Sequence, residues 1–273
     1  MRPVSKAKAV LITGASSGIG LATARLLAEQ GHAVVGTSRH PAAVSAANFD
    51  LVELDVTSDD SVAQCVATVL ERLGRVDVLV NNAGYGLLGF CEETSVAQAH
   101  DIFETNYFGA VRMIRAVLPA MRAQQGGLII NVASVAGYVG VPFESHYCAT
   151  KFALDGLSQA LRHEVAGFGI KVSVVNPGFM RTNFAAAAHR AADRIAVYDD
   201  LRQRIVEAFA GSFRAGSDPD TVARGIARIV RSASPRLRYW AGRDAIVFAW
   251  ARRLVPEAAI DAVLRRRFRV GKA

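Results

Sequence analysis

The sequence has little cysteine and no zinc-binding pattern. Its three cysteines, Cys65, Cys91 and Cys148, are widely spaced along 273 residues and odd in number. A disulfide framework needs an even set and a zinc site needs closely spaced ligands, so neither is predicted and no metal is expected. Unpaired cysteines are typical of a reducing compartment, and we therefore expect a cytoplasmic protein.

A long hydrophobic run is missing as well. The N-terminal segment has basic residues before an apolar stretch, but that stretch covers only residues 9–12, which is too short for the core of a signal peptide. The longest uncharged window, residues 123–143, is interrupted by Gln, Gly, Asn and Pro and is not expected to cross a membrane. Internal repeats and low-complexity linkers are also missing, so a single domain is predicted.

Charged residues make up 21% of the chain and hydrophobic residues 51%, which excludes intrinsic disorder. The formal net charge of +8 raises the question of a polyanionic partner. However, residues 224–273 carry 13 Lys and Arg against three Asp and Glu, and the rest of the chain is mildly acidic. The main body of the protein therefore needs no nucleic acid or other polyanion to explain its charge.

Short apolar runs alternate with longer amphipathic segments. The apolar runs lie at residues 9–13, 33–37, 51–54, 76–80, 127–132, 171–175 and 237–241, and the helical patterns at 18–30, 58–73, 99–122, 145–168 and 218–232. This alternation predicts a parallel sheet with helices on both faces. The fold class is therefore α/β, a single-domain doubly wound Rossmann fold of six to seven strands over residues 1–242. Its ligand site is expected at the carboxyl ends of the strands.

The first predicted strand runs directly into TGASSGIG at residues 13–20. Gly14 allows a tight turn, and Gly18 and Gly20 let the backbone approach a diphosphate at the start of a helix. We therefore predict a dinucleotide site, with a purely structural turn as the alternative. The predicted contacts of this loop are Gly14, Ser16, Ser17, Gly18, Ile19 and Gly20.

Further motifs follow along the chain. They are NNAG at 81–84, Asn106 in TNYFGA, Ser134 in NVAS, Tyr147 and Lys151 in YCATK, and PG at 177–178. Together with the glycine loop, their order and spacing resemble the short-chain dehydrogenase/reductase family. Residues 145–184 are most similar to the 17β-hydroxysteroid and retinol dehydrogenases. The resemblance implies an oxidoreductase that transfers hydride between a nicotinamide cofactor and a carbonyl or alcohol.

The resemblance also implies a catalytic set of Asn106, Ser134, Tyr147 and Lys151. Tyr147 and Lys151 are four residues apart and share one helix face. The lysine ammonium, together with an oxidised nicotinamide, is therefore expected to lower the tyrosine pKa and promote proton exchange with the substrate. Ser134 would donate a hydrogen bond to the substrate oxygen, and Asn106 would organise a water chain to Lys151. The alternatives are a strand-end turn residue at Ser134 and a core tyrosine at Tyr147.

By the same resemblance, other strand ends complete the cofactor site. Asp55 would contact the adenine, although N-capping of the helix near Ser58 is an alternative. Thr182 matches the position that holds the nicotinamide carboxamide, and Lys151 would also hold the nicotinamide ribose. Beyond the glycine loop, the predicted set is Ser38, Arg39, Asp55, Val56, Asn82, Ala83, Gly84, Tyr147, Lys151, Pro177, Gly178 and Thr182.

Residues 36–39, Gly-Thr-Ser-Arg, stand where the 2′ position of a dinucleotide is read. An acidic residue, which would repel a 2′-phosphate, is missing from this segment. Arg39 can pair with that phosphate, and Thr37 and Ser38 can donate hydrogen bonds. We therefore predict that NADP(H) is preferred over NAD(H). The alternative is a solvated Arg39 with loose cofactor specificity.

The segments expected around the reacting carbon are apolar or aromatic, which favours a steroid-, retinoid- or lipid-like ketone, aldehyde or secondary alcohol. Residues 183–215 are expected to form a mobile lid. Alternative functions are an NAD-dependent alcohol dehydrogenase of the same fold and a non-catalytic sensor of NADP(H), although a sensor needs no proton donor. The alternative is that several of the apolar side chains belong to the ordinary core. The predicted pocket residues are Leu87, Phe90, Val135, Val141, Phe143, Phe179 and Phe184.

Residues 243–273 form a basic extension with two predicted amphipathic helices, at 245–255 and 258–270. The extension could pack on the domain or on a partner subunit, or it could attach to an anionic membrane surface. Nucleic acid is not expected, because no recognisable binding module accompanies the arginines. The family resemblance implies a homodimer or homotetramer through the helices at 99–122 and 145–168.

Overall fold

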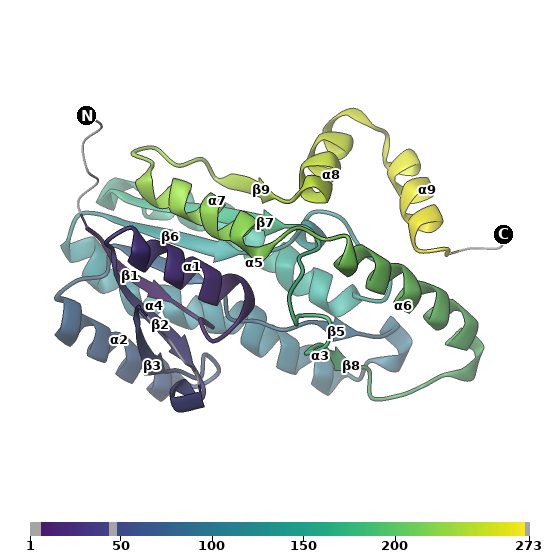
Figure 1. Ribbon diagram of the computed structural model, residues 1–273, viewed down its shortest axis with the longest axis horizontal. Coiled ribbons are helices and arrows are strands. Elements are labelled where there is room, and N and C mark those ends of the chain that lie inside the picture. The colour runs from purple at the N-terminus through teal and green to yellow at the C-terminus, as the bar shows by residue number, and fades with distance from the viewer. Residues whose placement is uncertain (1–6, 44–47, 271–273) are drawn as a thin grey trace.

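A parallel sheet of seven strands forms the centre of the molecule, which the computed structural model describes over residues 7–43 and 48–270 (Figure 1). The strand order is β3-β2-β1-β4-β6-β7-β9, so the direction of winding reverses between β1 and β4. This confirms the predicted doubly wound α/β fold. The strands are β1 (Ala9–Ile12), β2 (Ala33–Ser38), β3 (Asp50–Glu53), β4 (Val78–Asn81), β6 (Gly127–Val132), β7 (Ile170–Pro177) and β9 (Arg238–Ala241).

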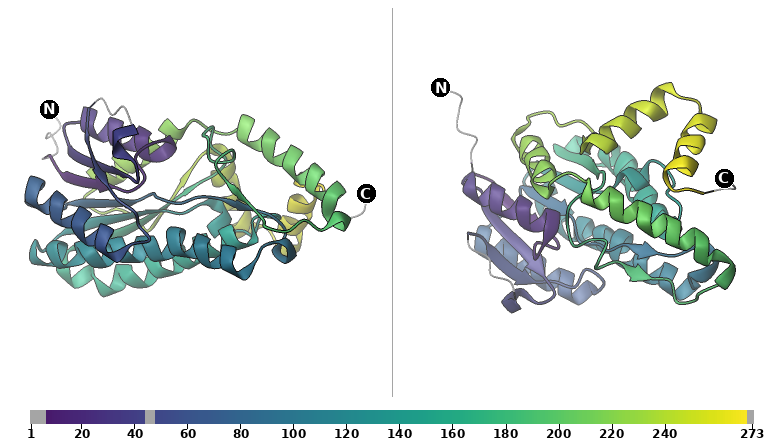
Figure 2. Two further views of the ribbon diagram at one scale, coloured as in Figure 1. Left: turned by 90° about the horizontal axis from the view of Figure 1, so that it is seen from below. Right: turned by 45° about the vertical axis from the view of Figure 1, so that its right-hand side comes forward.

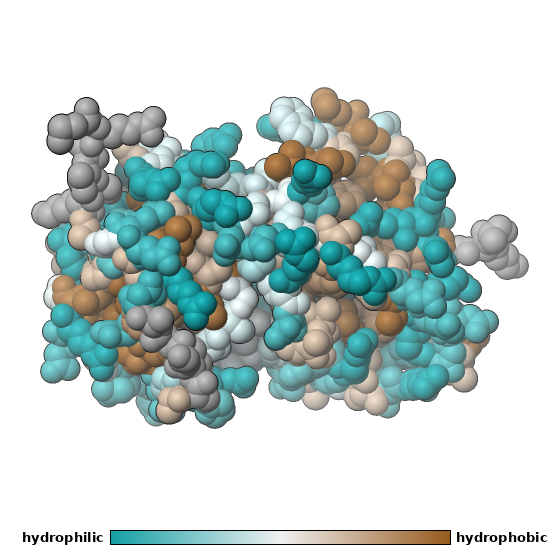
Figure 3. Space-filling model, in the orientation of Figure 1, coloured by the Kyte–Doolittle hydropathy of each residue, from teal (hydrophilic) through white to brown (hydrophobic). Residues whose placement is uncertain are grey.

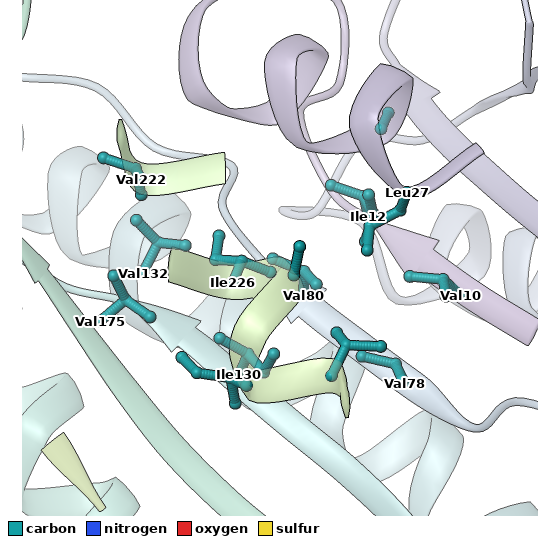
Figure 4. Packing of buried hydrophobic residues seen from close by; sticks show 14 of the residues in the cluster. Val10, Ile12, Leu27, Val78, Val80, Ile130, Val132, Val175, Val222 and Ile226 are labelled. Atoms are coloured by element: carbon teal, nitrogen blue, oxygen red, sulfur yellow. The ribbon is translucent and has the colours of Figure 1, made fainter. Parts of the chain in front are cut away.

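Helices cover both faces of the sheet (Figure 2, left). Alternate residues of the strands pack against opposite layers. Val10 and Ile12 pack in one cluster with residues of α1 (Gly18–Glu29) and α7 (Pro219–Arg231), which Figure 4 shows from close by. Leu11, between them, packs on the other face with residues of α2 (Asp59–Leu73), α4 (Gly109–Ala123) and α5 (Ser145–Glu164). Burial on both faces explains the near-continuous runs of Val, Ile and Leu.

The helix predicted at residues 99–122 is two helices joined by an irregular turn. It begins earlier, with α3 (Val96–Phe103), which Ser95 and Gln98 cap reciprocally. A π-helical turn at Glu104–Phe108 then leads into α4. Such a turn adds a residue to the helix and is frequent at functional sites. Here it carries Asn106, which is 1% exposed.

Residues 183–215, the predicted lid, contain more regular structure than the sequence suggested. They include β8 (His189–Arg190), which pairs with β5 (Leu87–Leu88), and the helix α6 (Asp199–Arg214). The mobility of this segment stays a prediction. Its position is nevertheless clear, because it passes over the carboxyl ends of the strands toward the C-terminal helices (Figure 1).

The C-terminal extension forms α8 (Arg243–Leu254) and α9 (Glu257–Arg267), which meet at an angle at one end of the molecule (Figure 2, right). Ile260, Leu264 and Phe268, spaced four residues apart, are buried. They belong to the same hydrophobic cluster as Ile205 and Phe209 of α6. The extension therefore packs on the domain, as one of the predicted alternatives proposed.

Candidate active site

The glycine loop makes the tight turn that its sequence predicts. Gly14 and Gly18 have φ angles of +66° and +54°, a backbone conformation that favours glycine. A Cβ atom at Gly20 would collide with the carbonyl oxygen of Gly14, so this glycine is needed for packing. Within the described chain, the first turn of α1 contains no acidic residue, and the Ser17 side chain does not cap it. The uncapped helix terminus suits an anionic diphosphate.

Asn82 stabilises the glycine loop through hydrogen bonds to its backbone. Its Nδ2 donates hydrogen bonds to the carbonyl oxygens of Thr13 and Gly14, both at 3.0 Å. Thr13 Oγ1 in turn accepts hydrogen bonds from the backbone N–H groups of Asn82 and Ala83, both at 2.9 Å. This role of Thr13 was not predicted, although the residue stands directly before the first glycine of the loop.

A continuous cavity of about 590 Å³ lies at the carboxyl ends of the strands. Gly20 does not line it, because this residue packs inside the loop, and Asn106 lies just behind the wall. The predicted cofactor and catalytic residues that line the cavity are Gly14, Ser16, Ser17, Gly18, Ile19, Ser38, Arg39, Asp55, Val56, Asn82, Ala83, Gly84, Ser134, Tyr147, Lys151, Pro177, Gly178 and Thr182.

Asp55 and Arg39 mark one end of the cavity. The Asp55 carboxylate accepts hydrogen bonds from the backbone N–H and the hydroxyl of Thr57, at 2.9 and 2.8 Å. These bonds, and more weakly the Arg39 charge, lower the pKa of Asp55. The capping alternative for Asp55 is wrong, because Ser58 caps α2. Arg39 is exposed and forms no ion pair with any other residue that the structure describes.

The four predicted catalytic residues lie close together. Lys151 Nζ is 5.6 Å from the centroid of the Tyr147 ring and donates a hydrogen bond to the carbonyl oxygen of Val132 at 3.1 Å. A Cβ atom at Gly84 would lie 2.8 Å from Asn106 Oδ1 and 3.8 Å from Lys151 Nζ. The missing side chain at Gly84 therefore leaves a space between Asn106 and Lys151.

The Asn106 side chain is held in both directions. Its Oδ1 accepts a hydrogen bond from the backbone N–H of Tyr85, and its Nδ2 donates to the carbonyl oxygen of the same residue, both at 2.9 Å. Nδ2 also donates to the hydroxyl of Thr150 at 3.3 Å. These bonds fix the amide beside Lys151, and the water chain between the two side chains stays a prediction.

The expected lowering of the Tyr147 pKa is not produced by the protein's own residues. Burial raises the pKa of Tyr147, the Glu144 charge raises it further, and hydrogen bonding with Ser134 lowers it. Burial also lowers the pKa of Lys151 to about 8. The ammonium lies over the tyrosine ring and bonds to a backbone carbonyl, so it contributes little to stabilising a phenolate. Tyr147 therefore holds its proton at neutral pH.

The predicted substrate residues divide into two groups. Val135, Val141, Phe179 and Phe184 line the cavity, whereas Leu87, Phe90 and Phe143 do not. The latter three belong to the hydrophobic cluster behind the wall. Leu87 lies in the short strand β5, Phe90 stacks on Tyr198 at 4.5 Å, and Phe143 contacts Phe90 edge-on at 5.0 Å. Their assignment to the pocket was wrong, because an apolar run does not reveal which residues face inward.

Several cavity residues were missed by the sequence analysis. Glu144 lines the cavity and is 5% exposed. The C-terminal extension contributes a wall, in which the Arg267 guanidinium lies 5.7 Å from the Phe179 ring and donates a hydrogen bond to Ser212 Oγ. The helical spacing of this segment was readable, but its packing partner was not. The missed lining residues of the extension are Phe248, Leu264, Arg267 and Phe268.

None of the helices that the structure describes combines the length and the apolar character that crossing a bilayer requires. No group of three or more His, Cys, Asp or Glu side chains within the described ranges could hold a metal ion.

Comparison with known proteins matches the chain to a single family. A family model described as short chain dehydrogenase matches residues 8–193. The chain is 38% identical over 259 residues to 3-ketodihydrosphingosine reductase from Bacteroides thetaiotaomicron, covering 94% of this chain and 96% of that protein. It is 40% identical over 255 residues to retinol dehydrogenase 8 from Bos taurus, covering 85% and 80% respectively.

A solved structure shows the same fold throughout. The crystal structure of a short-chain dehydrogenase from Streptomyces avermitilis has a TM-score of 0.83 and 36% sequence identity. The match covers 97% of this chain and 98% of that one, so it includes the C-terminal helices.

Proposed function

Because the chain belongs to the short-chain dehydrogenase/reductase family, we propose that it interconverts a hydrophobic carbonyl compound and its alcohol with NADP(H) in preference to NAD(H). It is an oxidoreductase that acts on CH–OH or C=O groups and uses a nicotinamide cofactor. The observation that carries the proposal is the single cavity that joins the glycine loop, Tyr147 and an apolar wall.

The protein's residues fit such a cofactor. The loop at Gly14 and Gly18, with the uncapped start of α1, would hold the diphosphate, and Lys151 would hold the nicotinamide ribose. Arg39 would pair with a 2′-phosphate at the far end. When bound, the cofactor supplies or accepts the hydride.

The proton transfer belongs to Tyr147. Its pKa is raised by burial, so the phenol carries a proton at neutral pH and can donate it to the oxygen of a carbonyl. Ser134 lies at the same wall and can donate a second hydrogen bond to that oxygen. Asn106 lies near Lys151 at the inner side of the site. There it would organise the water through which Tyr147 regains a proton.

The apolar wall supports a lipophilic substrate. Val135, Val141, Phe179 and Phe184 line it from the domain, and Phe248, Leu264 and Phe268 line it from the extension. The relatives named for a sphingoid ketone and for retinol agree with such a substrate.

The test is a panel of long-chain ketones, retinal and steroid ketones, each assayed with NADPH and NADH side by side. We expect NADPH oxidation with at least one lipophilic ketone or aldehyde. Tight NADPH binding without turnover on any member of the panel would replace the proposal with the sensor alternative.

We also propose that α8 and α9 contact an anionic membrane surface. They expose large apolar side chains, with Trp250 59% and Leu254 75% exposed, and Figure 3 shows hydrophobic surface over this part of the molecule. Arg252 and Arg253 are exposed on the same helix as those two residues. An apolar face with flanking arginines suits anionic lipid, and the same helices wall the cavity.

A homodimer or homotetramer through α4 and α5 also stays a proposal. Phe152 on α5 is 42% exposed and Phe108, directly before α4, is 45% exposed, so both helices present aromatic surface. Light scattering on the full chain tests this proposal, and a monomer at micromolar concentration would contradict it.

A further inference from the structure

Glu144 lies at the reacting end of the cavity and has a strained neighbour. It directly precedes α5, three residues before Tyr147, and lines the cavity although it is 5% exposed. Phe143 before it has a φ of +71°, a conformation that costs an aromatic residue roughly 1–3 kcal/mol. A hydrogen bond from the N–H of Gly89 to the carbonyl oxygen of Phe143 holds this turn. The strained turn sends Phe143 into the core and leaves Glu144 at the cavity.

The Glu144 carboxyl is unusual among the buried acids of this protein. Glu93 pairs with Arg202, and Asp155 accepts two hydrogen bonds from Arg238 at 2.8 and 2.6 Å. Over the described ranges, no hydrogen bond or ion pair reaches the Glu144 side chain. Burial without a partner raises its pKa to about 8. An isolated buried carboxylate is costly, so a group that brings a positive charge to it would be bound strongly.

Arg39 lines the far end of the cavity, and the two other cationic side chains of the wall, Lys151 and Arg267, already have partners. Lys151 donates to the carbonyl oxygen of Val132, and Arg267 lies over Phe179 and bonds to Ser212. The titratable groups that the Glu144 charge influences are Tyr147 and Cys148. The carboxyl is therefore beside the proton donor and within the apolar part of the cavity.

We propose that Glu144 is a binding site for a protonated amine of the substrate, so that the enzyme acts on hydrophobic ketones with an amino group next to the reacting carbon. The amine would supply a positive charge to a carboxylate that forms no ion pair within the described residues, and the apolar wall would contact the hydrocarbon chain. The inference rests on the proposed carbonyl reduction and adds to it the chemical class of the substrate.

A cycle of two substrates and two proteins tests the site. The substrates are 2-aminododecan-3-one and dodecan-3-one, and the proteins are the wild type and Glu144→Gln, which keeps the shape but not the charge. We expect the ratio of kcat/KM for the amino ketone over the plain ketone to fall about 100-fold in Glu144→Gln, as when one partner of a buried ion pair is removed. Glu164→Gln, an exposed position on α5, should keep the wild-type ratio.

An equal loss of both substrates in Glu144→Gln, or a wild type that does not prefer the amino ketone, would overturn the proposal. A binding measurement, which needs no turnover, tests the amine site separately from the proposed reductase activity. Dodecylamine should bind the wild type at least about tenfold more tightly than dodecan-1-ol, and Glu144→Gln should lose that preference. Equal wild-type affinity for the amine and the alcohol would refute the site, whatever the enzyme reduces.

Discussion

The ring of Phe184 lies 5.5 Å from the ring of Tyr147, centroid to centroid. A residue of the predicted lid segment therefore contacts the proposed proton donor, Tyr147, directly. Phe184 in turn lies 6.5 Å from Phe213 of α6, and Phe209 of that helix contacts Phe268 of the extension at 5.1 Å. This chain of aromatic contacts joins Tyr147 to the C-terminal helices, so the wall of the cavity is built from elements far apart in the sequence.

Replacing Tyr147 by Phe should abolish proton transfer and leave the aromatic contacts intact. We expect kcat to fall about 10²- to 10⁴-fold, because the variant keeps the ring and loses the donor. The affinity for NADPH, measured by fluorescence titration, should change little. Turnover within tenfold of the wild type would show that another group donates the proton.

Arg39→Ala should weaken NADPH binding far more than NADH binding. Because Arg39 is exposed, solvent screens its charge, and we expect about a tenfold rise in the NADPH dissociation constant. Arg72→Ala removes an exposed arginine on α2 and serves as the matched control. Calorimetric titrations with both cofactors measure the effect, and equal losses for the two cofactors would contradict the assignment.

The geometry of the predicted cofactor side was readable from the sequence because it depends on local structure. A glycine turn between a strand and a helix, and a Tyr–Lys pair four residues apart, have the same form wherever they occur. The substrate side depends on packing between distant segments. Neither the direction of Phe90 nor the docking of Phe268 could be inferred from apolar runs. Phe90 stacks on Tyr198, directly before α6, and Phe268 contacts Phe209 in α6.

The position of Glu144 at the cavity was not predicted, for a different reason. Charged residues next to a helix start are usually solvated, and its burial depends on the left-handed turn at Phe143, which the sequence does not mark with a glycine or asparagine. Asn106 was identified from its motif, but the π-helical turn that aims it inward carries no comparable signal.

The difference in stability between Glu144→Gln and the wild type should depend on pH in a defined direction. The pKa of Glu144 is raised from 4.5 to about 8, so the folded protein binds an extra proton between those values. The unfolding free energy of the wild type therefore falls as pH rises through this window. Its neighbour Cys148, with a pKa raised to about 12, and Tyr147, with its pKa raised by burial, stay uncharged throughout. Glutamine does not ionise, so the Glu144→Gln variant avoids this fall in the unfolding free energy.

Thermal unfolding at pH 5 and pH 8 measures this difference. We expect the Tm of Glu144→Gln minus the Tm of the wild type to be at least about 4 °C larger at pH 8 than at pH 5. Lys151, whose pKa is lowered to about 8, changes stability above this window and is present in both proteins. A pH-independent difference would mean that Glu144 is ionised when folded at pH 5.

Phe268→Ala should loosen the wall that the extension adds to the cavity. Phe268 is 1% exposed and packs with Phe209 and Leu264. We expect a loss of about 3–5 kcal/mol of stability and a rise in KM for a long-chain ketone, with a smaller rise for a short one. Trp250→Ala, at an exposed position of the extension, provides the control. A change in kcat without a change in KM would contradict a role in the pocket wall.

Exposed apolar residues of α8 should anchor the protein to anionic vesicles. The double variant Trp250→Ser and Leu254→Ser removes two large side chains that are 59% and 75% exposed, so it should float less with vesicles that contain phosphatidylserine. Each buried aromatic or leucine side chain is worth roughly 1.5–3 kcal/mol, and we expect at least a tenfold weaker partition. Val197→Ser, at an 82% exposed apolar position outside the extension, is the matched control. Arg252 and Arg253 flank these exposed apolar residues, so vesicle binding should also weaken at high salt and with uncharged lipid. If the double variant and the Val197→Ser control float equally well, the exposed apolar residues of α8 do not anchor the protein to the vesicles.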